Sequence, residues 1–144
     1  MKHLKQIQIQ IFLACMLGAL AVIAGAFSAH LLERFANQNI ITLRELSIFE
    51  KAVRYQMYHA LVLLVIGVWN LLGNRTVISI SFYLIFFGIV FFSGTLYWIA
   101  LQPIIHLSFP TYLFWVTPLG GLCMIVGWIL IFFEFKRFYI DYLK

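Results

Sequence analysis

Charged residues are scarce in this sequence, and their scarcity excludes most classes of soluble protein. Only 10% of the 144 residues are Asp, Glu, Lys or Arg, whereas a typical soluble domain carries about 25%. Hydrophobic residues make up 64% of the chain, and its mean hydropathy is +0.99. A soluble domain of this length has too little interior to bury so much apolar surface. The composition therefore predicts a protein that is dissolved in a lipid bilayer.

Acidic residues and known catalytic motifs are missing from the long apolar runs. All five acidic residues lie outside these runs, and no nucleotide-binding loop, zinc signature or serine elbow occurs. The two cysteines, Cys15 and Cys123, stand alone within apolar runs, which favours packing over metal or redox chemistry. The basic residues are spread singly or in pairs between the runs, a distribution typical of membrane orientation and not of nucleic-acid binding. We therefore expect no metal, no cofactor and no nucleic-acid partner, and we favour a protein that is not an enzyme.

Three long stretches contain no Asp, Glu, Lys or Arg, and they locate the membrane spans. These stretches cover residues 6–32, 55–74 and 76–133, which is 27, 20 and 58 residues. Because a helix needs about 20 apolar residues to cross the hydrocarbon, the first two hold one span each and the third holds two. Pro103 and Pro110 mark the turn within the third, since proline cannot continue a helix interior. The predicted spans are 8–31, 55–74, 77–101 and 111–133.

The continuous length of these runs excludes the alternating pattern of a membrane β-barrel and indicates helices. We therefore predict an all-α fold, an integral membrane four-helix bundle with short connecting loops, formed by residues 1–144 as a single transmembrane domain. The first run could instead be a signal peptide that is cleaved at Ala26, but it is longer than the apolar core of such peptides. Six Lys and Arg residues fall on the side of the two termini and four on the other, which favours cytoplasmic termini.

A polar segment precedes the second span and is expected to form an interfacial helical extension of it. Thr42 and Glu45 have the spacing of a capping box, so a helix is predicted to begin there. Glu50 and Arg54 stand four residues apart and can form an ion pair on that helix. Arg54 is also interpreted as an interfacial anchor, with its stem along the lipid and its head in water.

Glycines and tryptophans distinguish packing positions from interfacial positions. Glycines let membrane helices approach closely, so we interpret those in the first and last spans as helix-packing residues. Tryptophan favours the membrane–water interface. The tryptophans around the third connection are interpreted as anchors, and those at positions 69 and 128 are assigned to the opposite face. The packing residues are Gly18, Gly25, Gly120, Gly121 and Gly127, and the anchors are Arg54, Trp98 and Trp115.

Polar side chains gather at one end of the predicted bundle. Because successive spans cross in opposite directions, the ends of the first and third spans share a side with the starts of the second and fourth. Polar groups inside lipid are costly, so they tend to face the bundle and bond to one another. The layer is either a set of interhelical hydrogen bonds or a proton-responsive or ligand-binding site built on its histidines. Its members are His30, Gln56, His59, Ser93, Tyr97 and Thr117.

Four motifs extend over nearly the whole chain. They are GAFSAH at 25–30, YQMYHAL at 55–61, FSGTLY at 92–97 and TPLGG at 117–121, followed by GW at 127–128. Together and in this order they resemble the family called domain of unknown function 423, or uncharacterised protein family 0382. The sequence departs from that family's pattern at Ser28, where the family has glycine, and at residues 31–33. The resemblance implies four spans in a bacterial-type plasma membrane, and it supplies no mechanism.

These observations favour a multi-pass membrane protein with a non-catalytic structural, assembly or regulatory role. Its expected partners are membrane lipids and either a second copy of the chain or another membrane protein. The alternative is a transporter of small solutes, ions or protons that uses the polar layer as its pathway. Metal or haem binding by His30 and His59 has little support, because no carboxylate or thiolate accompanies them.

Overall fold

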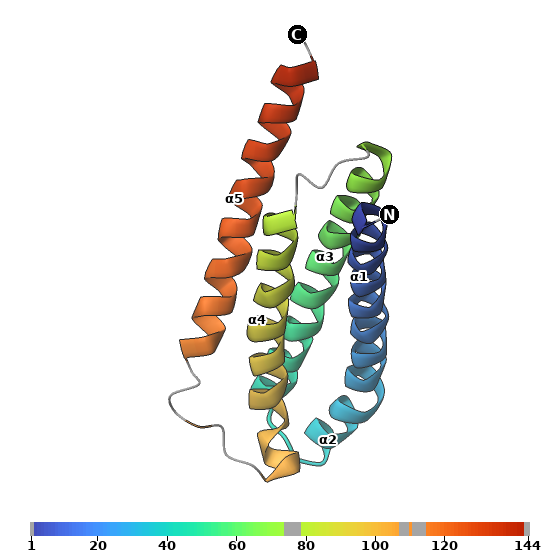
Figure 1. Cartoon of the computed structure of the whole chain (residues 1–144). Helices are drawn as coiled ribbons and strands as arrows, with labels where there is room; N and C mark the ends of the chain where they lie inside the picture. Colours follow the sequence, from blue (N-terminus) through green and yellow to red (C-terminus); the bar gives the residue numbers. More distant parts are fainter. Residues whose placement is uncertain (1, 74–78, 107–109, 111–114, 143–144) are drawn as a thin grey trace.

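The computed structural model describes residues 2–73, 79–106, 110 and 115–142, and over these residues the chain is helical and without strands (Figure 1). Four of its helical stretches are long and apolar enough to cross a membrane. The all-α membrane fold predicted from the sequence is therefore confirmed. In chain order the elements are α1 (Lys2–Phe27), the π-helix η1 (Ser28–Leu32), α2 (Glu33–Asn37), α3 (Leu43–Gly73), α4 (Ser79–Ile105) and α5 (Val116–Tyr142).

The first span is longer than its uncharged run, because η1 and α2 continue α1 without a break in the helical backbone. The membrane-capable stretch covers Leu4–Asn37, whereas the prediction ended at residue 31. The chain reverses after Asn37 through Asn39, whose φ of 58° places it in the left-handed region. Asparagine enters that region more readily than most residues, which suits it to this turn.

The capping box predicted at Thr42 and Glu45 is present, and it starts α3. The Thr42 backbone N–H donates to Glu45 Oε2 at 2.6 Å, and the Thr42 hydroxyl donates to the same oxygen at 2.8 Å. In return, the Glu45 N–H donates to Thr42 Oγ1 at 3.4 Å. These bonds satisfy backbone donors that a helix start leaves without partners. The helix then runs on to Gly73, so the interfacial extension and the second span are one element.

Pro103 does not end α4 where the sequence suggested. The helix continues through Pro103 to Ile105, four residues beyond the predicted end at 101. It stops at His106, which has a φ of 53° and donates its N–H to the carbonyl of Gln102 at 3.0 Å. A left-handed residue of this kind is a common helix terminator. The hairpin predicted between the last two spans falls mostly outside the described residues.

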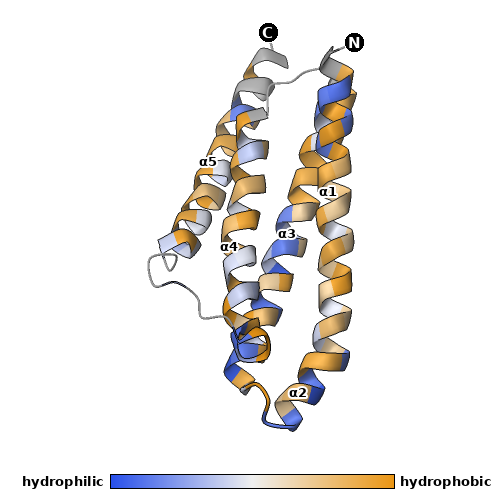
Figure 2. Cartoon of the chain, turned by 60° about the horizontal axis from the view of Figure 1, so that its bottom comes forward, coloured by the Kyte–Doolittle hydropathy of each residue, from blue (hydrophilic) through white to orange (hydrophobic). Residues whose placement is uncertain are grey.

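The helices pack side by side in the order α1, α3, α4, α5 (Figures 1 and 2). Both termini lie toward the same end of the molecule (Figure 1). Helix α5 also reaches α3 through aromatic side chains, because the rings of Trp69 and Phe135 meet at a centroid distance of 4.7 Å. One hydrophobic core, centred on Phe82, Ile85 and Leu63, draws residues from all four long helices. A second cluster, which includes Leu32 and Ala100, packs the turn around α2 against the end of α4.

Glycines bring the last two helices together, as predicted for Gly120 and Gly127. A Cβ at Gly120 would lie 2.5 Å from the backbone nitrogen of Phe92, and one at Gly127 would lie 2.6 Å from Ile85 Cγ1. Gly25 and Gly121 make ordinary contacts, since their nearest atoms would lie 3.5 and 3.7 Å from a Cβ.

The packing role predicted for Gly18 is not seen within the chain, because no neighbouring helix among the described residues lies within 4 Å of a Cβ there. Two glycines at tight contacts were missed. A Cβ at Gly88 would lie 2.5 Å from Met124 Cγ, and one at Gly67 would lie 2.8 Å from Ile11 Cγ1.

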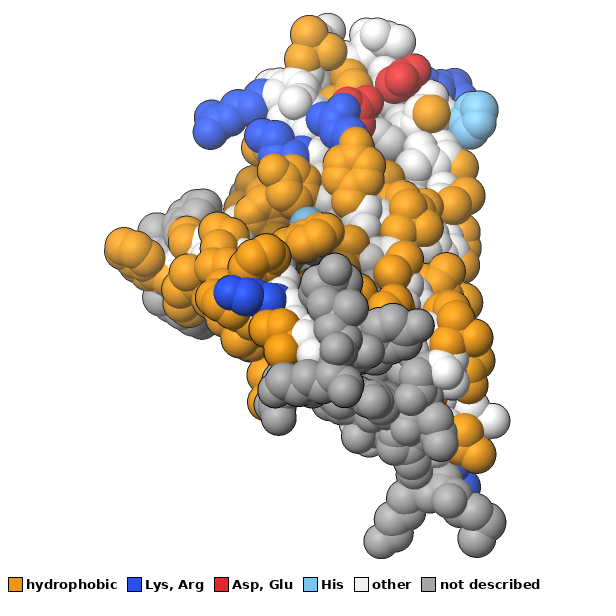
Figure 3. Space-filling model, turned by 90° about the horizontal axis from the view of Figure 1, so that it is seen from above, with side chains coloured by type: hydrophobic (Ala, Val, Ile, Leu, Met, Phe, Trp, Pro, Cys, Tyr) orange, Lys and Arg blue, Asp and Glu red, His pale blue; other side chains and the backbone are white. Residues whose placement is uncertain are grey.

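The outer surface is that of a lipid-exposed protein. Large hydrophobic side chains such as Ile23, Val65 and Phe132 are more than half exposed. Hydrophobic side chains also cover most of the described surface in Figure 3, and basic and acidic side chains gather together along one margin. Exposed apolar surface on this scale requires a membrane around it.

Candidate functional site

Gln56 joins three helices at the centre of the predicted polar layer. It lies on α3 and is only 5% exposed. Its side-chain Nε2 donates to the backbone carbonyl of Leu17 on α1 at 2.8 Å. Its Oε1 accepts a hydrogen bond from the hydroxyl of Tyr97 on α4 at 2.9 Å. The amide thus ties α1 to α4 across a gap that their backbones do not close.

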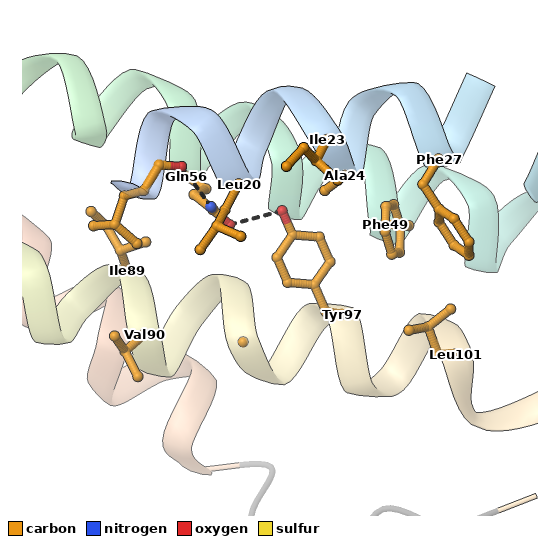
Figure 4. A pocket seen from close by; sticks show the side chains of 12 residues that line it. Leu20, Ile23, Ala24, Phe27, Phe49, Gln56, Ile89, Val90, Tyr97 and Leu101 are labelled. Carbon is orange, nitrogen blue, oxygen red and sulfur yellow. Dashed lines mark hydrogen bonds between the residues drawn. The ribbon is translucent and has the colours of Figure 1, made fainter. Parts of the chain in front are cut away.

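This gap is an apolar groove of about 530 Å³ between α1 and α4, with α3 as its floor (Figure 4). Leu20, Ile23 and Phe27 form one wall, and Val90, Tyr97 and Leu101 form the other. The only polar side chains in the lining are those of Gln56 and Tyr97. Ligand-sized sites in proteins have volumes of this order and a similar balance of apolar walls and few polar groups.

His59 lies on another face of α3 and uses both of its ring nitrogens. Its Nε2 accepts a hydrogen bond from the indole N–H of Trp128 on α5 at 3.3 Å. Because Nε2 is an acceptor, the ring proton sits on Nδ1, which lies 2.8 Å from the carbonyl of Tyr55 and donates to it. The two contacts fix the orientation of the His59 ring between α3 and α5.

Thr117 contributes to the layer through a partner that the sequence did not suggest. The hydroxyl of Thr95 lies 2.6 Å from the Thr117 hydroxyl, 2.6 Å from the carbonyl of Phe91 and 3.0 Å from that of Phe92. One hydroxyl carries one proton. Thr95 therefore donates to the backbone of α4 and accepts from Thr117, which links α4 to α5.

The remaining members of the predicted layer do not join these contacts. His30 lies in η1 with its side chain exposed. Ser93 is 1% exposed, and its hydroxyl has no hydrogen-bond partner among the described residues. The structure thus brings Gln56 and Tyr97 together, and places His59 and Thr117 at separate contacts with α5 and α4. Of the predicted anchors, Arg54, Trp98 and Trp115 all have exposed side chains, and their anchoring role stays a prediction.

The two histidines allow a matched test of which one matters to the fold. We expect His59→Ala to lower the free energy of unfolding in detergent by about 1 kcal/mol, because the Trp128 N–H is left without its acceptor. We expect His30→Ala to change it by less than about 0.5 kcal/mol, as for most surface substitutions. Equal effects of the two variants on unfolding would contradict the assignment of His59 to the α3–α5 contact.

A second group of polar side chains, near the end that holds the termini, was not anticipated from the sequence. Asn70 Nδ2 on α3 donates to Gln10 Oε1 on α1 at 3.0 Å, and both side chains are 1% exposed. Ser81 on α4 donates to Glu134 Oε2 on α5 at 3.0 Å. Glu134 was expected beyond the last span, but it lies within the membrane-capable stretch Val116–Lys136. The sequence did contain a signal for the first of these contacts. Gln10 and Asn70 each place an amide inside an apolar run, and amides within lipid tend to form hydrogen bonds between helices.

The described residues contain no group of three or more His, Cys, Asp and Glu side chains that could hold a metal ion. The polar side chains that the structure brings together form hydrogen bonds. Donors and acceptors on Gln56 and Tyr97 face an apolar groove, and others link neighbouring helices.

Four membrane-capable helices, an apolar outer surface and polar bonds between helices define a multi-pass helical membrane protein. The chain belongs to the family described as "Protein of unknown function (DUF423)", whose model matches residues 24–121. This confirms the resemblance found in the four sequence motifs.

Relatives in staphylococci are similar over most of their length. A UPF0382 membrane protein of Staphylococcus saprophyticus is 42% identical over 123 residues, which is 84% of this chain and 91% of the relative. One from Staphylococcus epidermidis is 41% identical over 130 residues, covering 89% of this chain and 95% of the relative. One from Staphylococcus haemolyticus is 38% identical over the same length. No solved structure matches the chain.

Proposed function

We propose that this protein is a non-catalytic assembly or regulatory element of the membrane, which acts by receiving another membrane protein in the groove between α1 and α4. The observation that carries the proposal is the groove itself. Its walls are two helices, and among the described residues the Gln56 amide forms hydrogen bonds to both of them. Aliphatic and aromatic side chains line this groove, and membrane helices associate by close van der Waals packing of such surfaces.

Transport has less support from the same contacts. A pathway for ions or polar solutes needs polar groups that follow one another across the membrane and can exchange partners. Gln56 and Tyr97 bond to each other in an apolar lining, and His59 has both nitrogens engaged on a different face. His30, the other histidine of the proposed relay, has an exposed side chain.

We further propose that the membrane is the plasma membrane and that both termini are cytoplasmic. The support is the excess of basic residues on the side of the termini, six against four, since Lys and Arg near span ends favour the cytoplasmic side. Fusion of a reporter that is active only in the cytoplasm to the C-terminus tests this orientation.

The proposal predicts a defined protein neighbour at the groove. A photo-crosslinking residue at Val90, in the groove wall, should give one discrete protein adduct in native membranes, and the same residue at Leu122 should give none. Leu122 is an exposed residue of α5 that does not line the groove.

Proteoliposomes of the purified protein should show no flux of protons or small ions. A His59-dependent flux, without a groove adduct, would support the transport alternative and contradict the proposal.

A further inference from the structure

A small polar cavity lies between α1 and α3, on the flank of their contact opposite to the groove. Its volume is about 260 Å³. Gly25, Ser28 and Ala29 line it from the first span. It shares no lining residue with the groove, so it is a separate site. The residues that line it from α3 are Glu50, Val53 and Arg54.

Two opposite charges face this cavity without neutralising each other. The ion pair predicted between Glu50 and Arg54 does not form, since neither has an ion-pair partner among the described residues. The Glu50 side chain is half-buried and that of Arg54 is exposed. A carboxylate and a guanidinium one helical turn apart can therefore receive a ligand that carries both charges.

Ser28, a buried residue, also lines the cavity. Ser28 is 4% exposed, and its Oγ has no hydrogen-bond partner among the described residues. Leaving a buried polar group unpaired is costly, so such groups normally have a partner. Ser28 is also the first residue of η1, and single π-helical turns occur often at functional sites.

Gly18 leaves open space on α1 between the cavity and the membrane centre. Gly18 stands two turns before Gly25 on the same face of α1, and a Cβ at Gly18 would meet nothing within 4 Å. On α3, Leu61 stands two turns after Arg54 and is 53% exposed. The space beside Gly18, which the sequence had assigned to helix packing, is thus open to a lipid chain.

We propose that this cavity and the space beside Gly18 bind one phospholipid whose headgroup carries both a phosphate and a primary ammonium, namely phosphatidylethanolamine. The guanidinium of Arg54 and the hydroxyl of Ser28 donate hydrogen bonds to the phosphate, and the ammonium donates to the Glu50 carboxylate. Charge-assisted bonds of this kind are the strong ones in proteins. An anionic headgroup would meet repulsion from Glu50, and a quaternary ammonium has no hydrogen to donate.

Lipid competition, followed by native mass spectrometry of the full chain in detergent, tests the proposal. With equal amounts of phosphatidylethanolamine, phosphatidylglycerol and phosphatidylcholine, the first should give most of the adducts. Arg54→Gln should lower the amount of phosphatidylethanolamine adduct about tenfold. Glu50→Gln should reverse the preference in favour of phosphatidylglycerol, because only the cation then remains. The matched control is Lys51→Gln, an exposed residue of α3 outside the cavity lining, which should leave the adducts unchanged.

Equal adducts of the three lipids on the unmodified chain would overturn the proposal. So would equal losses in Arg54→Gln and Lys51→Gln, since lipid binding would then follow net charge alone. Glu50→Gln and Arg54→Gln change side chains that are not fully buried, so both variants should fold, and circular dichroism verifies this.

Discussion

Gly120→Ala is expected to lower the free energy of unfolding by about 3 kcal/mol, the upper part of the range for overpacking. The added methyl would lie 2.5 Å from the backbone nitrogen of Phe92 and 3.0 Å from the carbonyl oxygen of Gly88. Both are backbone atoms of α4, so no side chain can rotate away. The clash can be relieved only by moving α5 away from α4, which weakens the contacts along that seam. Unfolding of the purified protein in detergent measures the loss.

Gly18→Ala is the matched control, because it adds the same methyl to another membrane helix. No neighbouring helix among the described residues lies within 4 Å of that position, so the variant should unfold within about 0.5 kcal/mol of the unmodified chain. If the two glycines proved equally tolerant, α4 and α5 would not be in backbone contact, and the packing described for the last two helices would be wrong.

Gln56→Leu is expected to lower the free energy of unfolding by about 2 kcal/mol. It removes two interhelical hydrogen bonds of about 0.6 kcal/mol each, and it leaves the Tyr97 hydroxyl without an acceptor in an apolar groove, at a cost of about 1 kcal/mol. Tyr97→Phe removes one of these bonds together with its donor, so its effect should be nearer 0.6 kcal/mol.

The double variant Gln56→Leu/Tyr97→Phe separates the hydrogen bond from other effects of the substitutions. Once Gln56 is leucine, removing the Tyr97 hydroxyl should restore stability, because the orphaned donor is gone. The two changes are therefore coupled and not additive. Strict additivity would show that Tyr97 and Gln56 do not bond in the folded protein.

The spans and the side on which polar groups gather were predictable, because both follow from run length and alternating direction. Gln56 and Tyr97 were placed together on that basis, and the structure joins them at 2.9 Å. The rotation of each helix about its own axis could not be predicted in the same way. His30 lies at the end of the bundle where the polar layer was predicted, but its side chain is exposed on η1.

Trp128 shows how an error in helix length misplaces a residue. The predicted span ended at 133, just before Glu134, and this put Trp128 near the face opposite to His59. Helix α5 runs on to Tyr142, so Trp128 lies near its middle and reaches His59. Glu134 lies within α5, where the hydroxyl of Ser81 on α4 donates a hydrogen bond to it.

The packing role of some glycines could be predicted from the sequence, and that of others could not. Gly120 stands next to Gly121, and adjacent small residues of this kind are typical of helix packing. Gly67 and Gly88 are surrounded in sequence by large side chains, so nothing in the local pattern distinguished them. Their role depends on Ile11 and Met124 of other helices, and only the folded arrangement reveals it.

The central claim is that α1 packs on α3 and stays apart from α4, which leaves the groove open. Disulfide cross-linking in native membranes tests it directly, in a background that carries Cys15→Ala and Cys123→Ala. The pair Gly25→Cys/Val53→Cys should cross-link, because a Cβ at Gly25 lies 3.5 Å from Val53 Cγ1. The pair Leu20→Cys/Val90→Cys, from opposite walls of the groove, should remain unlinked. Efficient cross-linking of the second pair would mean that α1 and α4 close on each other, and it would contradict the account.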